Sequence, residues 1–159
     1  MRITVVCVGK IKEDYFTGAV REYAKRLSRY CRLEIVEVPD EKTPDQAPEA
    51  VNRQILEKEG KKILAKIPAD AYVIALAVEG KQPDSPGLAA KIEKLGIQGV
   101  SHIVFVIGGS LGLHEQVMER AAEAMSFSRL TFPHQLMRVI LLEQIYRAYR
   151  IINHEPYHK

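Results

Sequence analysis

The stretch Val104–Gly112 (Val-Phe-Val-Ile-Gly-Gly-Ser-Leu-Gly) decides the fold of this chain. Its first four residues are apolar and mostly β-branched, and they end a buried strand that is expected to begin at His102. The glycines that follow must turn the chain, and the next residues have the pattern of a helix from His114 to about Ala122. A strand, a glycine turn and a helix in this order are typical of a parallel α/β sheet.

The same alternation of strands and helices extends along the chain in both directions. Strands are predicted at residues 2–8, 32–38, 71–78, 102–107 and 124–127. Helices are predicted at residues 13–30, from the end of a polar loop (39–48) to 67, and at 88–95, 114–122 and 133–153, and residues 154–159 form a tail. This pattern predicts an α/β fold with a mostly parallel sheet flanked by helices, in a single domain of residues 1–159.

The composition excludes several classes of protein. The chain has 159 residues, of which 47% are hydrophobic and 27% charged, as expected of a soluble globular domain. No apolar run is long enough for a membrane span, and the apolar start runs directly into charged residues instead of a cleavage site. The two cysteines, Cys7 and Cys31, have no metal-binding or redox spacing, so we expect a protein of the reducing cytoplasm.

Charge is unevenly distributed along the chain. Residues 10–32 contain seven basic and three acidic residues, residues 34–59 three basic and eight acidic, and residues 129–159 five basic and two acidic. Two basic segments around an acidic middle fit a face that binds a polyanion such as nucleic acid. The alternative for each segment taken alone is an ordinary solvated helix surface.

The last predicted helix has more apolar residues than one face can hold. Leu136, Ile140 and Tyr146 are among eleven apolar or aromatic residues between 136 and 152. A helix that packs only on its own sheet needs one apolar face, so two faces favour a second copy of the chain as partner. The alternative is a central helix that is buried deeply within one chain.

The glycine turn matches parts of three known motifs. Gly108-Gly109-Ser110-Leu111-Gly112 has the G-x-S-x-G pattern of a serine esterase, with Ser110 as nucleophile. That mechanism also needs an acid and a histidine further along, and no aspartate follows Asp84. The third glycine of a dinucleotide-binding motif and the Gly-Lys-Ser/Thr of a P-loop are missing. A turn that lets a ligand approach the backbone closely remains, with a plain tight turn as the alternative.

Two more segments carry candidate functional residues. Residues 126–135 contain serine and threonine before Pro133, which indicates a helix start whose free N–H groups can bind a ligand. In the tail, His154 and His158 are four residues apart, but Pro156 breaks the helix that metal ligation would need, so no metal site is predicted. The tail offers a proton acceptor and a ring, Tyr157, for stacking on a base, or it is simply a frayed end.

Several short motifs along the whole chain occur together in one known family. They are Val5–Lys10, Gly108-Gly109-Ser110-x-Gly112, Ser126-x-Ser128-x-x-Thr131-x-Pro133-His134, Arg138-Val139 with Glu143-Gln144-x-Tyr146-Arg147-Ala148, and Pro156-Tyr157-His158. On these residues the chain resembles the ribosomal RNA large-subunit methyltransferase H family of trefoil-knot (SPOUT) methyltransferases.

The resemblance implies a fold, a reaction and a cofactor. It implies a C-terminal trefoil knot, an obligate homodimer and S-adenosylmethionine as methyl donor. It also implies methylation of N3 of a pseudouridine in helix 69 of 23S rRNA, on assembled ribosomes. Carried over by position from the family, the cofactor pocket would comprise Leu76, Gly108, Phe127, Ser128, Arg129, Leu130, Thr131 and Phe132.

The remaining roles are hypotheses from residue chemistry. His154, Tyr157 and His158 are the candidate catalytic residues, because an imide proton must be removed and a base positioned. Arg138, Arg147 and Arg150 lie on the last helix and are candidates for holding RNA phosphates. A serine esterase using Ser110 and a non-catalytic RNA-binding protein are the rival functions.

Overall fold

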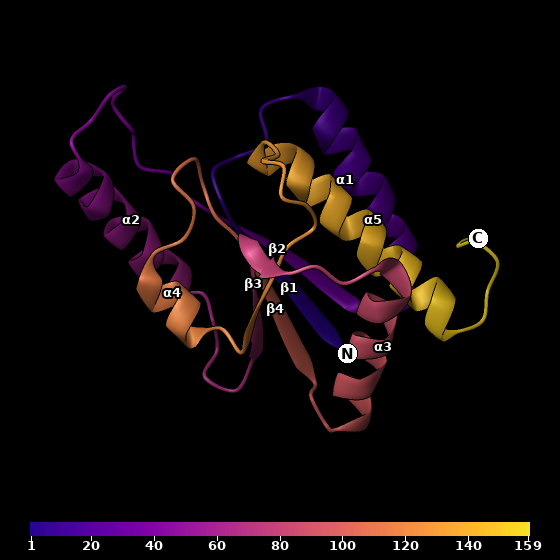
Figure 1. Ribbon diagram of the computed structural model, residues 1–159. Helices are drawn as coiled ribbons and strands as arrows, with labels where there is room; N and C mark the ends of the chain where they lie inside the picture. Colours follow the sequence, from indigo (N-terminus) through magenta and orange to yellow (C-terminus); the bar gives the residue numbers. More distant parts are fainter.

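The computed structural model describes all residues, 1–159, and contains one sheet of five parallel strands (Figure 1). The strands are β1 (Arg2–Val8), β2 (Arg32–Val38), β3 (Tyr72–Lys81), β4 (His102–Ile107) and β5 (Glu123–Met125). Their order in the sheet is β2-β1-β4-β3-β5, and every neighbouring pair is parallel. The prediction of an α/β fold with a parallel sheet is therefore confirmed.

Five helices cover both faces of the sheet. They are α1 (Asp14–Leu27), α2 (Glu49–Leu64), α3 (Ser85–Ile97), α4 (Glu115–Arg120) and α5 (His134–Ile152). The larger core lies between the sheet and α1, α3 and α5, and the smaller core lies between the other face and α2 and α4 (Figure 1). Because β1 and β4 are central, their side chains are buried almost throughout, which explains their unbroken apolar sequence.

Strand β3 is longer than the sequence predicts. The prediction ended it at residue 78 because Gly80 and two prolines follow, but the strand continues to Lys81. Gly80 is what permits this extension, since a Cβ there would lie 2.7 Å from the backbone of Ala124 and Met125 in β5. Beyond the glycine, Lys81 pairs with Met125, and the N–H of Ser126 donates to the Lys81 carbonyl over 2.8 Å.

Helix α5 lies between α1 and α3 and above the sheet, so much of its apolar surface is buried within one chain. Leu141, Leu142 and Ile145 are fully buried, whereas Leu136 and Ile140 stay half-exposed. A single chain can thus enclose most of this helix, which weakens the sequence argument for a dimer. The half-exposed residues leave a narrower apolar face for a partner.

The end of α5 lies within one residue of its predicted position at 153, but a residue before Pro156 ends the helix. The helix ends at Ile152, and His154 adopts the left-handed conformation, with φ of 55°. The His154 N–H donates to the Ile151 carbonyl, and the Glu155 N–H donates to the Arg150 carbonyl. This is the Schellman arrangement, in which a left-handed residue ends a helix and satisfies its last carbonyls. The residue that redirects the tail is therefore His154.

Candidate active site

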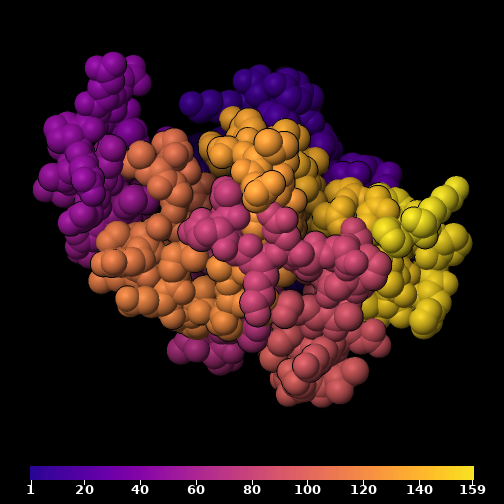
Figure 2. Space-filling view, viewed as in Figure 1, coloured from indigo at the N-terminus to yellow at the C-terminus, as the bar shows by residue number.

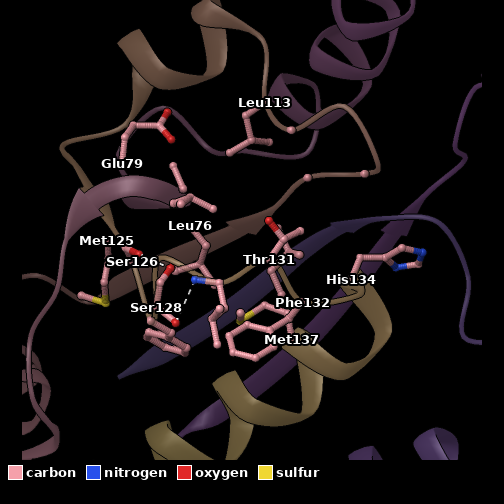
Figure 3. A pocket seen from close by; sticks show the side chains of 18 of the residues that line it. Leu76, Glu79, Leu113, Met125, Ser126, Ser128, Thr131, Phe132, His134 and Met137 are labelled. Carbon is pink, nitrogen blue, oxygen red and sulfur yellow. Dashed lines mark hydrogen bonds between the residues drawn. The ribbon is translucent and has the colours of Figure 1, made fainter. Parts of the chain in front are cut away.

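A cavity of about 540 Å³ opens at the carboxyl ends of β3 and β4, next to the start of α5 (Figure 3). Three segments far apart in sequence line it: residues 76–79, residues 107–113 except Leu111, and residues 125–134 except Arg129. Met118 and Met137 complete the wall. In the space-filling view these segments meet on one face of the molecule (Figure 2). The position is the one where open parallel sheets bind ligands, and the volume suits a cofactor.

Exposed apolar side chains surround this cavity. Leu130 is 70% exposed and Val78 is 46% exposed, and both belong to the lining. Leaving large apolar side chains in water is unfavourable unless a ligand or partner covers them. The cavity is therefore prepared for an apolar surface such as a purine ring.

The charge of the lining restricts the ligand further. Glu79 is the one carboxylate among the lining residues, and no lysine or arginine lines the cavity. The lining thus offers a polyphosphate ligand no cationic side chain, whereas a sulfonium or ammonium group is attracted by a carboxylate. The cavity thus favours a ligand with an apolar ring and a positive charge.

Residues 126–130 form a tight turn that shapes one wall. The Ser126 hydroxyl donates to the Ser128 carbonyl over 2.8 Å, and the Leu130 N–H donates to the Ser128 hydroxyl oxygen over 3.0 Å (Figure 3). Both serines are therefore occupied in organising the loop, and neither they nor Thr131 caps α5, which begins without a side-chain capping bond. The expectation of a side-chain-capped helix start at this place was wrong.

The glycine turn closes on itself beside the cavity. A Cβ on Gly108 would lie 2.5 Å from the Gly112 carbonyl oxygen, and Gly112 itself has φ of 85°. Both positions therefore need glycine for the turn, irrespective of any ligand. A bulky substitution at Gly108 would disrupt the turn, so it is not a clean probe of ligand binding.

The geometry around Ser110 does not support an esterase. A nucleophile elbow places its serine directly between strand and helix, whereas β4 ends at Ile107 and α4 begins only at Glu115. No hydrogen bond joins Ser110 to a histidine or a carboxylate. The exposed hydroxyl of Ser110 lacks the activating base that its chemistry would require.

The structure brings most of the expected pocket residues together. The cavity is lined by Leu76, Gly108, Phe127, Ser128, Leu130, Thr131 and Phe132. Arg129 is the exception, because it is exposed and does not belong to the lining. Sequence analysis missed Glu79, Leu113 and Met137, since only the fold shows that their segments meet here.

The position of Arg138 contradicts the prediction that this residue holds an RNA phosphate. Its side chain is fully buried, donates to Glu37 over 2.6 Å and to the Gly9 carbonyl over 3.2 Å, and has no surface to offer a phosphate. Arg138 instead ties the start of α5 to the carboxyl ends of β1 and β2.

His134 packs against Gly9, the residue that follows β1, and its ring points away from the cavity (Figure 3). Burial, followed by the nearby Arg138 charge, lowers the pKa of His134, so its ring is neutral at neutral pH.

Arg147 and Arg150 hold the tail. Arg147 donates to Glu143 over 2.6 Å and lies over the ring of Tyr157, and Arg150 donates to Glu155 over 2.9 Å. Both arginines remain partly exposed, at 25% and 17% of their side chains.

The tail folds back along α5 and away from the cavity of its own chain. The Tyr157 hydroxyl donates to Glu143 over 3.0 Å, its ring packs edge-on against Tyr146, and His158 lies 3.1 Å from Arg147. Burial and the Glu143 carboxylate raise the pKa of Tyr157 to about 12, so it is a phenol at neutral pH. Neither His154, Tyr157 nor His158 lines the cavity.

Parallel strand ends, a glycine turn and a ligand-sized cavity together define an α/β protein that binds a cofactor at the carboxyl edge of its sheet. A family model described as a predicted SPOUT methyltransferase matches residues 1–158. The chain is 61% identical over its full length to a ribosomal RNA large subunit methyltransferase H of Bifidobacterium adolescentis, and 57% identical to those of Clostridium perfringens and Listeria monocytogenes; in each case all of both chains is covered.

A solved structure agrees on the fold. A probable methylase family protein from Haemophilus influenzae superposes with a TM-score of 0.56 at 12% identity, over 99% of this chain and 70% of that one. This chain therefore belongs to the SPOUT methyltransferase family. No helix has the length and apolar character that crossing a membrane requires.

Proposed function

We propose that this chain transfers a methyl group from S-adenosylmethionine to ribosomal RNA, at N3 of a pseudouridine in helix 69 of 23S rRNA on assembled ribosomes. The observation that carries the proposal is the cavity at the carboxyl ends of β3 and β4, with its exposed apolar rim and its single carboxylate. The curated relatives in Bifidobacterium, Clostridium and Listeria support the choice of large-subunit RNA as substrate. SPOUT methyltransferases use S-adenosylmethionine.

The lining fits this cofactor in chemistry and size. Leu76, Phe127 and Leu130 provide apolar surfaces for the adenine ring, and Glu79 lies on the wall as a partner for positive charge. Segments 107–112 and 126–132 bring backbone N–H and carbonyl groups to the wall, where they can bind the polar edges of the cofactor. S-adenosylmethionine supplies a methyl group that its sulfonium charge already activates. The residues of this chain therefore need only orient the target base and remove the proton from its nitrogen.

The target nitrogen must lose its proton as the new N–C bond forms and the C–S bond breaks. A histidine near neutral pH is the side chain best suited to accept such a proton, and the tail carries His154 and His158. Tyr157 is protonated and can donate a hydrogen bond to the base or stack on it. The apolar walls exclude water and hold the reacting atoms in line.

The active unit in this proposal is a homodimer with a trefoil knot formed by the glycine turn, the 126–133 loop and α5. Within one chain, Glu143, which holds the tail, lies roughly 9 Å along α5 from Met137 of the cavity wall, at 1.5 Å per residue. To act at the cavity, the tail must therefore either leave Glu143 and move toward the cavity of its own chain, or reach into the cavity of a second chain. The half-exposed Leu136, Val139 and Ile140 on α5 offer the apolar face for that second chain.

Calorimetric titration with S-adenosylmethionine tests the cofactor assignment. We expect saturable binding, competition by S-adenosylhomocysteine, and no binding of ATP as a control purine with the wrong charge. Absence of binding at cofactor concentrations up to about 1 mM would overturn the proposal, since this corresponds to only about 4 kcal/mol.

Deletion of residues 156–159 tests the tail. The deletion removes Tyr157 and His158 but leaves the helix end at His154 and every cavity residue in place. We expect cofactor binding and the sedimentation behaviour to match the full chain, while methyl transfer to ribosomes is lost. Full activity of the deleted chain would refute a catalytic role for Tyr157 and His158, and sedimentation of the full chain as a folded monomer would refute the dimer.

A further inference from the structure

The fold joins the two basic segments of the sequence. Helix α1 comes from the first basic segment and packs directly beside α5, which comes from the last one. The acidic loop 39–48 leads into α2, which lies on the opposite face of the sheet and carries four basic and three acidic residues (Figure 1). The two basic segments therefore lie side by side on one face of the sheet, although the net charge of the chain is only +3.

One side of α1 carries this charge in a regular pattern. Arg21, Lys25 and Arg29 are spaced by four residues, so they line one side of the helix and its C-terminal end, opposite Val20 and Leu27, which face the core. All three cationic side chains are exposed. The stripe therefore faces solvent along the C-terminal half of the helix and just beyond its end.

Most cations of this stripe have no partner within the chain. Arg21 and Lys25 make no ion pair or side-chain hydrogen bond, and Arg29 lies 3.7 Å from Glu155 and over the Tyr30 ring while its side chain remains 67% exposed. The acidic residues of the helix are Asp14 at its first turn and Glu22, which is paired with Arg26. Unpaired, exposed cations at helical spacing are available to bind phosphates, unlike the arginines of α5.

The stripe leads to the cavity. Lys10 and Lys12 are exposed and unpaired, and they lie in the connection between β1 and α1. The Lys12 N–H donates to the Gln135 side chain over 2.9 Å, which places this connection at the start of α5, beside the cavity wall. Exposed cations thus lie at the cavity edge and again along the second half of α1, with none between Lys12 and Arg21.

We infer that Lys10, Lys12, Arg21, Lys25 and Arg29 form the track along which the phosphate backbone of the substrate RNA docks. The inference rests on the proposed RNA substrate and names the surface that holds this RNA outside the cavity. A track of this kind binds the backbone without reading bases, so it orients the RNA and leaves selection of the nucleotide to the cavity and the tail.

The test is the double variant Arg21→Gln/Lys25→Gln, with Lys58→Gln/Lys66→Gln as matched control. The control residues are exposed, unpaired and on the α2 side, and the change in net charge is the same. Losing two phosphate contacts lowers the salt slope of log Kd for ribosomes by roughly 1.4 to 1.8 and raises Kd roughly 20- to 60-fold at about 0.1 M salt. The control and the affinity for S-adenosylmethionine should not change.

Ribosome binding and methyl transfer are measured separately, so the two proposals can fail separately. If the parent chain binds ribosomes but transfers no methyl group, the proposed function is wrong. The ribosome-binding measurements on the two variants still test the track in that case. If the stripe variant and the control bind ribosomes with the same Kd and salt slope, the track is overturned. A parent chain that binds no ribosomal RNA would overturn both.

Discussion

The ion pair between Arg138 and Glu37 makes an asymmetric prediction about stability. Arg138 is fully buried, whereas the Glu37 side chain is 37% exposed, and the two groups are 2.6 Å apart. Removing either partner breaks the same contact but leaves a different group behind. The two substitutions should therefore lower the free energy of unfolding by different amounts, and the difference shows which group depends on the other.

Glu37→Ala leaves a buried guanidinium with the Gly9 carbonyl as its remaining acceptor, and it also removes the acceptor of the Ile11 N–H. Breaking a buried pair from this side costs about 3 kcal/mol. Arg138→Met keeps most of the buried volume and leaves a carboxylate that water can reach, so it costs about 1 kcal/mol.

Urea unfolding at neutral pH and fixed protomer concentration measures both losses, with m-values checked for constancy. Glu37→Gln, which keeps an acceptor oxygen, should lie between the parent and Glu37→Ala. Equal losses, or a larger loss for Arg138→Met, would refute the reasoning. If Arg138 bound RNA phosphate instead, both variants would unfold like the parent and only ribosome binding would decrease.

Three further predictions concern the cavity and pH. Leu130→Ala should weaken S-adenosylmethionine binding by about 1–2 kcal/mol, roughly 5- to 30-fold in Kd, yet leave Tm unchanged because the residue is 70% exposed without ligand; unchanged affinity in calorimetry would remove Leu130 from the site. Ser110→Ala should retain methyl transfer, and complete loss would revive a nucleophilic role for this hydroxyl. Burial lowers the pKa of both His102 and His134, so the unfolded chain binds more protons below pH 6.5 and the free energy of unfolding should fall as the pH decreases from 7 to 5.5. His134→Gln should reduce that fall, and an identical pH dependence in the variant would contradict the prediction.

Local patterns in the sequence predict the sheet and the cavity well, because buried strands and glycine turns depend on nearby residues. The strand 32–38 was predicted with its observed bounds, and the glycine turn does lie beside the cavity. The extension of β3 past Gly80 could not be predicted, because it depends on the close approach of β5. The burial of Arg138 was hidden for the same reason: its partner Glu37 is 101 residues away in sequence.

The two-faced apolar pattern of α5 shows another limit. The number of apolar residues in α5 can be read from the sequence, but the elements that cover them cannot. In the structure, α1 and α3 of the same chain cover many of them. The resemblance to the family named seven of the eight residues that it expected as lining of the cavity, whereas Arg129 is exposed and lies outside the lining. The roles of the tail and of the cationic stripe depend on partners that a single chain does not contain.

Transfer of radiolabelled methyl from S-adenosylmethionine to ribosomes lacking this modification tests the central claim most directly. The labelled 23S rRNA is digested to nucleosides, which are separated and identified by mass spectrometry. The account predicts one labelled product, N3-methylpseudouridine, from a fragment containing helix 69, and no label with ribosomes that already carry the modification. No label in RNA, despite measured cofactor binding, would contradict the claim that this chain is an RNA methyltransferase acting on the ribosome.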